Sequence, residues 1–152
     1  MGTYLNNRIA AFFALLLVIL SLLYSTTFHA PFNFDDEVVI KFEAVQKRTH
    51  DWYAELYPPK YRHLFYSSLI FNYSKGQLNP FGYHLVNTSL HFFTSIVIFF
   101  IAFITIKKGL SLSKKEALSI AGITTLLFSI NPVHSETVNY ISARAVGMSS
   151  FF

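Results

Sequence analysis

Three neighbouring carboxylates, Asp35, Asp36 and Glu37, follow directly after a long apolar segment in the stretch APFNFDDEVVI. An aspartate held beside a hydrophobic surface is suited to act as a general base, or as a ligand of a divalent metal ion such as Mg²⁺ or Mn²⁺. The same residues also suit the start of a helix, because Asp is a favoured N-cap and acids stabilise the positive end of a helix. Since the two aspartates are adjacent, one can cap the helix while the other faces a site.

A second group of ionisable residues lies in the stretch NPVHSETVNYISAR, which contains His134, Glu136 and Arg144. Such a stretch supplies donors for a phosphate and a partner for a carboxylate. A solvated loop is the alternative interpretation. Arg62, in the stretch YRHL, is an isolated cation that would pair with one of the acids or extend toward lipid headgroups.

Polar residues at His84, Asn87 and His91 are spaced three and four apart, so they share one face of a helix. Polar side chains inside a membrane usually face the interior of a helix bundle. Hydrogen bonds between helices are the simplest use of this stripe. The two histidines would lie about two helical turns apart, which is a poor geometry for one metal ion.

The composition is that of a membrane protein rather than of a soluble domain. Hydrophobic residues make up 53% of the 152 residues, aromatic residues 18% and charged residues 13%. The absence of Cys excludes a disulfide or thiolate-metal framework. The net charge of +4 does not indicate nucleic acid as a partner, because the basic residues are scattered or lie at the ends of apolar segments, where they orient a membrane protein.

Apolar segments predict an all-α fold, a polytopic bundle of transmembrane helices. A bilayer core about 30 Å thick needs roughly 20 apolar residues in a helix. No small-x-small cleavage pattern follows the first segment, so we expect an uncleaved span rather than a signal peptide. The fourth segment has eight residues, which are too few to cross, so we expect the chain to be a fragment. The predicted spans are residues 8–28, 83–106, 117–131 and, incomplete, 145–152.

The loops predict the orientation of this bundle. The stretch KKGLSLSKKE holds four lysines and one glutamate, so this loop and the N-terminus with Arg8 are predicted to be cytoplasmic. Residues 29–82 hold six acids and six bases and are predicted to lie outside, beyond the plasma membrane if the source is bacterial. Apolar spacing in residues 34–57, and the apolar stretch YRHLFYSSLIFNYS, predict interfacial helices within this outer loop.

Several of these stretches together resemble the start of a membrane glycosyltransferase of the GT-C class. The chain is most similar to a bacterial member of the family related to the protein O-mannosyltransferases with transmembrane and tetratricopeptide repeats. His63 departs from the family pattern, which commonly has Pro after YR. The resemblance covers most of the chain from Phe34 onward and rests on FNFDDEVVI, YRHLFYSSLIFNY, LNPFGYHLVNTSLH and NPVHSETVNYISARAVGMSSFF, of which NPFGYHLVN and NPVHSETVNYISAR are the specific parts.

The resemblance implies that residues 1–152 form the N-terminal part of a transmembrane glycosyltransferase domain. Such an enzyme transfers a sugar from a polyprenyl-phosphate donor to a protein or lipid acceptor at the outer membrane face. Asp36 matches the acid that would activate the acceptor hydroxyl as a base or metal ligand, and Asp35 is the alternative. The residues that would hold the donor or the acceptor are Glu37, Arg62, His134, Glu136 and Arg144.

Members of the family continue with further spans and often with a tetratricopeptide region, so we expect this chain alone to be inactive. The expected partners are membrane lipid, the polyprenyl-linked sugar donor and the acceptor, without nucleic acid. The alternative function is that of a non-catalytic polytopic membrane protein, such as part of a transporter or an assembly factor. In that case the outer acids only cap a helix.

Overall fold

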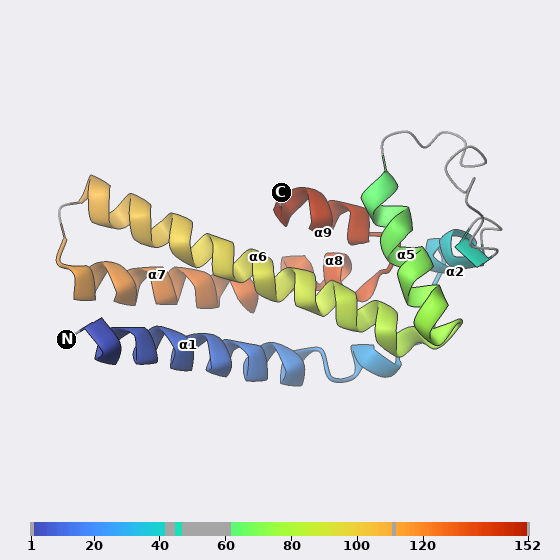
Figure 1. The fold of residues 1–152 in the computed structure, drawn as a ribbon, viewed down its shortest axis with the longest axis horizontal. Helices are drawn as coiled ribbons and strands as arrows, with labels where there is room; N and C mark the ends of the chain where they lie inside the picture. The colour runs from blue at the N-terminus through green and yellow to red at the C-terminus, as the bar shows by residue number, and fades with distance from the viewer. Residues whose placement is uncertain (1, 42–44, 47–61, 111, 152) are drawn as a thin grey trace. The chain divides into compact units, whose positions relative to one another are not determined.

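The computed structural model describes residues 2–41, 45–46, 62–110 and 112–151. The regular secondary structure of these residues is entirely helical, which confirms the predicted all-α class. The described elements are α1 (Gly2–Leu23), η1 (Thr27–His29), α2 (Asp35–Lys41), α5 (His63–Gly76), α6 (Pro80–Gly109), α7 (Lys114–Ser129), η2 (Pro132–His134), α8 (Ser135–Asn139) and α9 (Arg144–Phe151) (Figure 1).

The chain divides into two compact units, which are described separately. The first unit consists of Met1–Ser25 and Thr88–Ser135, together with Phe151. The second unit contains Thr26–Asn87 and Glu136–Ser150. Helix α6 contributes its first residues to the second unit and the remainder to the first.

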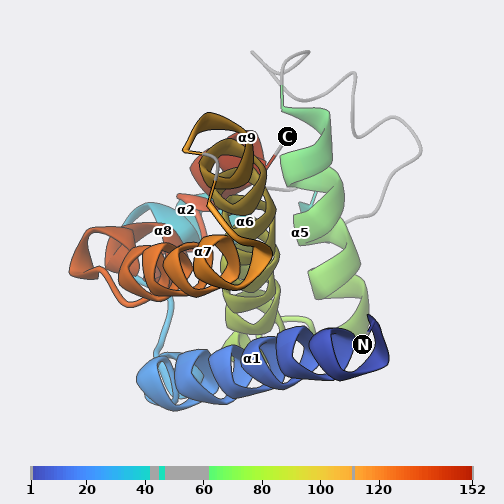
Figure 2. The ribbon, with the colours of Figure 1, turned by 90° about the vertical axis from the view of Figure 1, so that its left-hand side faces the viewer.

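In the first unit, α1, α6 and α7 lie side by side (Figures 1 and 2). Aromatic rings join α1 to α6, because Phe12 and Phe13 each contact Phe99 at centroid distances of 5.6 and 5.1 Å. Polar groups join α6 to α7, where the Ser129 hydroxyl donates to the Ser95 hydroxyl at 2.8 Å. Hydrogen bonds of this kind hold apolar helices together in an environment where burial of hydrocarbon gives no driving force.

Local sequence signals explain where α6 and α7 begin. Ser113 and Glu116 form a capping box at the start of α7, in which each side chain accepts a hydrogen bond from the backbone of the other. At the start of α6, the Asn79 side chain accepts from the backbone N–H of Phe81 at 3.0 Å, and Pro80 occupies the first helical position. Both helices therefore begin at residues that satisfy their first free N–H groups.

Among the described helices, α6 is long and apolar enough to cross a membrane, with 30 residues. Helix α7 and the helical segment Pro132–Asn139 meet at an angle of 50°. They satisfy the same criterion only if they are taken together as one span. The apolar part of α1, Asn7–Leu23, is shorter. The structure thus supports one spanning helix within the described ranges, and the predicted bundle of several spans stays a prediction.

The second unit has its own hydrophobic core. Two helices predicted for the outer loop contribute to it: α2 forms the start of the predicted segment 34–57, and α5 forms from the stretch that follows YPPK. Residues 42–44 and 47–57 of the first segment lie outside the described residues. Each buried Leu, Ile or Phe contributes about 1.5–3 kcal/mol of hydrophobic stabilisation. The core residues are Ile40, Val45, Phe65, Leu69, Tyr83 and Ile141.

Candidate functional site

Asp36 occupies the first turn of α2, and its side chain is only 1% exposed. The backbone N–H of Ser142 donates a hydrogen bond to Oδ1 of Asp36 at 2.7 Å. Such a bond to an ionised carboxylate is short and about twice as strong as a neutral one. Because Ser142 lies between α8 and α9, this bond brings the first acidic motif and the end of the second predicted motif together.

Two further polar contacts fix the segment that leads to Asp36. The Thr27 hydroxyl donates to Oδ1 of Asn139 at 2.9 Å, so the segment is also attached to α8. Nε2 of His84, at the start of α6, lies 3.2 Å from the carbonyl oxygen of Ala30. The segment before α2 is therefore held at two points along its length.

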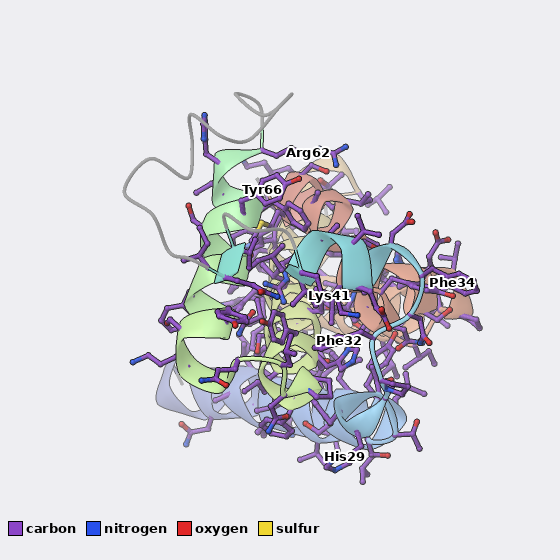
Figure 3. All side chains as sticks on the ribbon, turned by 90° about the vertical axis from the view of Figure 1, so that its right-hand side faces the viewer. His29, Phe32, Phe34, Lys41, Arg62 and Tyr66 are labelled. Atoms are coloured by element: carbon purple, nitrogen blue, oxygen red, sulfur yellow. The ribbon has the colours of Figure 1, made fainter. Side chains whose placement is uncertain are left out.

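The residue before the acids has an unusual backbone. Phe34 has a φ of 47°, a conformation that costs a bulky L-residue roughly 1–2 kcal/mol. Its ring is 84% exposed and points away from the unit, whereas the ring of Phe32 packs against Tyr83 at 5.4 Å (Figure 3). Strain of this kind persists where surrounding contacts enforce it, and it is concentrated at functional sites.

The guanidinium of Arg144, the first residue of α9, is fully buried. Its Nε donates to Oδ1 of Asn87 at 2.7 Å, and Nη2 donates to the carbonyl oxygen of Tyr83 at 2.9 Å. Nη1 donates both to the Ser68 hydroxyl at 2.9 Å and to Oδ1 of Asn72 at 2.8 Å. Arg144 therefore connects α9 to both α5 and α6.

The two amides that accept from Arg144 are themselves oriented by backbone carbonyls. Nδ2 of Asn72 donates to the carbonyl oxygen of Gly82 at 3.1 Å. Nδ2 of Asn87 donates to the carbonyl oxygens of Val138 and Tyr140 at 3.2 and 2.9 Å. Both side-chain oxygens consequently face the guanidinium, and the network is satisfied without a carboxylate bonded to the arginine.

Burial lowers the pKa of the Arg144 guanidinium to about 10, so it remains protonated at neutral pH. The nearby Asp36 carboxylate acts in the opposite direction and favours the charged form of Arg144. The site thus places a buried carboxylate within electrostatic range of a buried cation whose hydrogen bonds are made to the protein itself. The Ser142 N–H therefore positions Asp36, and the charge of Arg144 contributes to its electrostatic environment.

The remaining predicted site residues are partly or largely exposed. Asp35 and Glu37 are exposed on α2, and Glu37 forms an ion pair with Lys41 at 2.7 Å. Arg62 is exposed just before α5 (Figure 3), and Glu136 is exposed in the first turn of α8.

His134 belongs to the first unit. Its ring packs against Phe128 and His91 at centroid distances of 4.3 and 5.2 Å. These ring contacts give His134 a packing role within the first unit.

The fit of a divalent metal can be judged from the donor set. In the part of the chain that the structure describes, no group of three or more His, Cys, Asp or Glu side chains could hold a metal ion. Asp35 and Asp36 alone do not make the set of six or more oxygen ligands that Mg²⁺ or Ca²⁺ prefers. The described side chains therefore do not form a binding site for a divalent metal ion.

The partners of Arg144 were not predicted from the sequence. Asn87 was expected on the inward face of its helix, and the structure confirms that His84, Asn87 and His91 are all buried. Ser68 and Asn72 are four residues apart on α5, a spacing that places both on one helical face and was the available signal. The sequence did not indicate which cation contacts this face of α5.

Comparisons with known proteins identify similar chains. The chain is 34% identical over 148 residues to the protein O-mannosyl-transferase TMTC2 of Mus musculus and of Homo sapiens, matching 86% of this chain and 16% of each relative. It is 34% identical over 92 residues to the protein O-mannosyl-transferase TMTC3 of Mus musculus, matching 60% of this chain and 9% of that protein.

No family model matches the chain. No solved structure matches it either. The chain spans less than a fifth of the length of these relatives, and the partial matches support a relationship to the protein O-mannosyl-transferases.

Proposed function

We propose that this chain serves in a membrane glycosyltransferase that moves a sugar from a polyprenyl-phosphate donor to a protein or lipid acceptor at the outer membrane face. The observation that carries the proposal is the Ser142–Asp36 hydrogen bond, which holds a buried acid next to the segment that begins α9. The names of the similar proteins support the transferase class and make mannose the first sugar to test.

In this proposal Asp36 is the general base. The acceptor hydroxyl attacks the anomeric carbon of the donor, the bond from that carbon to the phosphate oxygen breaks, and the polyprenyl phosphate leaves with the electron pair. The hydroxyl proton passes to the carboxylate of Asp36. Because Oδ1 already accepts from Ser142, we assign Oδ2 to the acceptor hydroxyl. Removal of a general base typically costs 10²–10⁴-fold in rate.

Arg144 has a positioning role in this proposal rather than direct contact with the donor phosphate. Its guanidinium is buried, and its printed hydrogen bonds all run to protein oxygens. Its buried positive charge lies within electrostatic range of the Asp36 carboxylate. Contact with donor or acceptor is assigned instead to three exposed candidates of the second unit, Glu37, Arg62 and Glu136.

The proposed topology keeps the predicted orientation, with the N-terminus and the lysine-rich loop between α6 and α7 cytoplasmic and residues 29–82 outside. The acid and the arginine then lie on the outer side, where a lipid-linked donor presents its sugar. Four exposed lysines at the helix ends that flank this loop support the orientation: Lys107 and Lys108 in the last turn of α6, and Lys114 and Lys115 at the start of α7.

The test is sugar transfer by the full-length protein carrying Asp36→Asn. Asparagine keeps an oxygen that can accept from Ser142, so the fold is retained while the base is removed. We expect transfer from a polyprenyl-phosphate mannose donor to fall at least 100-fold, with normal membrane insertion. Glu116→Gln is the control of equal charge change, because this exposed carboxylate belongs to the first unit and has no assigned role in sugar transfer. Full activity of Asp36→Asn would remove Asp36 from the mechanism.

The second candidate is a purely structural role for Asp36. The burial of the Asp36 side chain favours this role. In that case the chain is a non-catalytic membrane protein in which Asp36 only satisfies the N–H of Ser142. The full-length protein would then bind no polyprenyl-phosphate sugar, and Asp36→Asn would leave every measured property close to that of the native protein.

A further inference from the structure

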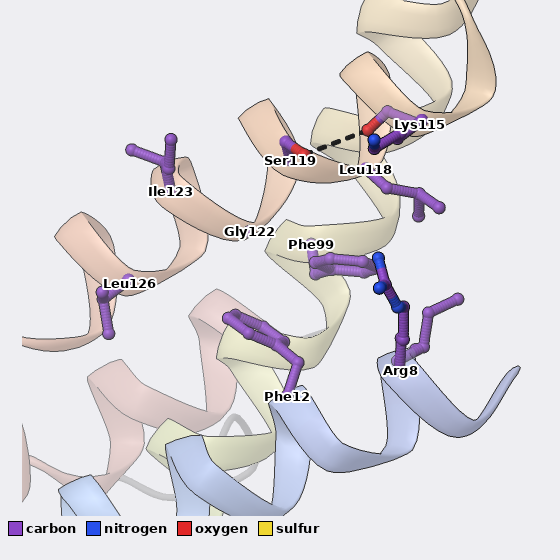
Figure 4. A pocket seen from close by; sticks show the side chains of 10 residues that line it. Arg8, Phe12, Phe99, Lys115, Leu118, Ser119, Gly122, Ile123 and Leu126 are labelled. Atoms are coloured by element: carbon purple, nitrogen blue, oxygen red, sulfur yellow. Dashed lines mark hydrogen bonds between the residues drawn. The ribbon is translucent and has the colours of Figure 1, made fainter. Parts of the chain in front are cut away.

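A groove of about 410 Å³ lies in the first unit between α1 and α7, next to Phe99 of α6 (Figure 4). We call it the α1–α7 groove. Its volume falls within the roughly 300–1,000 Å³ that is usual for small-molecule sites. It involves none of the residues assigned to glycosyl transfer.

Most of the groove wall is hydrocarbon. Phe12 and Phe99 form one side, and Leu118, Ile123 and others of α7 form the opposite side (Figure 4). Gly122 lies between them, and a Cβ at this position would be 3.7 Å from the Phe12 ring. The absence of a side chain at Gly122 therefore keeps the groove open, and the walls suit an extended hydrocarbon chain.

Two cations line the same groove. Arg8 reaches from α1 toward α7, and Lys115 lies in the first turn of α7 (Figure 4). No acidic residue is among the described residues that line it. Glu116, the acid that follows Lys115 in the sequence, accepts hydrogen bonds from Ser113 in the capping box. The groove is thus apolar with a positive end, which is complementary to an anion that carries a hydrocarbon chain.

We propose that the α1–α7 groove binds an anionic phospholipid of the cytoplasmic leaflet, with one acyl chain against Phe12 and Phe99 and the phosphate between Arg8 and Lys115. This assignment rests on the orientation proposed above, which puts the beginnings of α1 and α7 on the cytoplasmic side. That leaflet is rich in anionic lipids, and basic pockets between helices on this side hold their headgroups. A soluble anion would not use the apolar walls.

The test is native mass spectrometry of the full-length protein released from detergent, with phosphatidylglycerol and phosphatidylcholine offered at equal concentration. We expect one tightly held phosphatidylglycerol and a weaker association of phosphatidylcholine. Because a cation near an anionic headgroup contributes a roughly fivefold change in affinity, the pair Arg8→Gln and Lys115→Gln should reduce retention about 25-fold. Lys107→Gln with Lys108→Gln is the control of equal charge change and should retain the lipid.

A second pair of variants tests the apolar wall independently of charge. Gly122→Leu should fill the groove and reduce phosphatidylglycerol retention at least tenfold. Thr124→Leu adds a similar side chain at an exposed position of the same helix outside the groove and should not. Circular dichroism of each variant verifies that the helices are intact.

Three outcomes would overturn the proposal. Equal retention of the two lipids would show that the groove does not select an anion. Equal losses in the groove variants and their controls would show that lipid binding is diffuse. Displacement of phosphatidylglycerol by an equal concentration of inorganic phosphate or of a polyprenyl phosphate would assign the groove to a free anion or to the sugar carrier. None of these measurements depends on glycosyl transfer.

Discussion

The carboxylate of Asp36 and the backbone N–H of Ser142 are 2.7 Å apart, although 106 residues separate them in the chain. Asp36 is almost fully buried, so the bond satisfies a group that water does not reach freely. It is also the contact by which the second unit positions its candidate base.

Asp36→Ala and Asp36→Asn should therefore differ in stability. Alanine leaves the Ser142 N–H without its acceptor, and we expect a loss of about 1–3 kcal/mol in the free energy of unfolding. Asparagine retains an acceptor and should remain within about 1 kcal/mol of the native protein. Thermal unfolding in detergent measures the difference. Equal stability of the two variants would mean that the Ser142 bond contributes little.

Arg144→Met should destabilise the protein strongly, because it leaves the oxygens of Asn72, Asn87 and Tyr83 without their donor. We expect a loss of about 3 kcal/mol or more. Arg144→Lys should not restore the native stability, since an ammonium group cannot reproduce the fork of the guanidinium. Lys75→Met, at an exposed position of α5, is the control and should change the free energy of unfolding little. Near-native unfolding of Arg144→Met would contradict the network.

The stability of the first turn of α7 should depend on pH, because Glu116 takes part in its capping box. Hydrogen bonds from the Ser113 hydroxyl and backbone N–H lower the pKa of the Glu116 carboxyl. Its stabilising contribution is therefore fully present above the ordinary pKa of 4.5 and is lost as the pH falls through the lowered pKa of the folded state. Ser113→Ala removes the larger cause, so the pKa of Glu116 should rise toward its ordinary value. An NMR titration of the labelled carboxyl carbon measures both values, and an unchanged pKa in the variant would exclude this cause.

The proposed orientation predicts opposite labelling of two single cysteines. These 152 residues contain no Cys, so Glu37→Cys and Lys108→Cys each introduce the only thiol among them. Both positions are exposed. In intact cells, a membrane-impermeant maleimide should label Glu37→Cys and should label Lys108→Cys only after the cells are opened. The reverse pattern would invert the topology.

The sequence predicted those parts of the fold that depend on local patterns. Helix α6 follows from a long apolar run, and α5 from a shorter one. The polar stripe of α6 was correctly expected to be buried, because a polar group in a spanning helix needs a partner. These predictions succeed since each uses spacing within a single helix.

The contacts of the candidate site could be predicted only in part. Two polar motifs were expected on one side, and the structure brings Asp36 to Ser142 within a single unit. The role of Arg144 was not apparent, because an arginine in a polar stretch is equally suited to a phosphate or to buried amides. Only the positions of Asn72 and Asn87 distinguish the two uses, and these depend on how three helices pack. Residues 42–44 and 47–57 of the predicted helix 34–57 lie outside the described residues.

Two hydrogen bonds of the second unit determine when its candidate site can form during protein synthesis. Thr27 and Asp36 find their partners at Asn139 and Ser142, more than 100 residues later. During translation, Thr27 and Asp36 leave the ribosome long before those partners exist, and they remain unpaired while α6 and α7 are synthesised. Contacts between such distant residues form slowly because the chain between them must first be ordered. The bond that positions the candidate base consequently forms only after Ser142 has been synthesised, and a nascent chain released earlier would carry every acid of the first motif yet lack this bond.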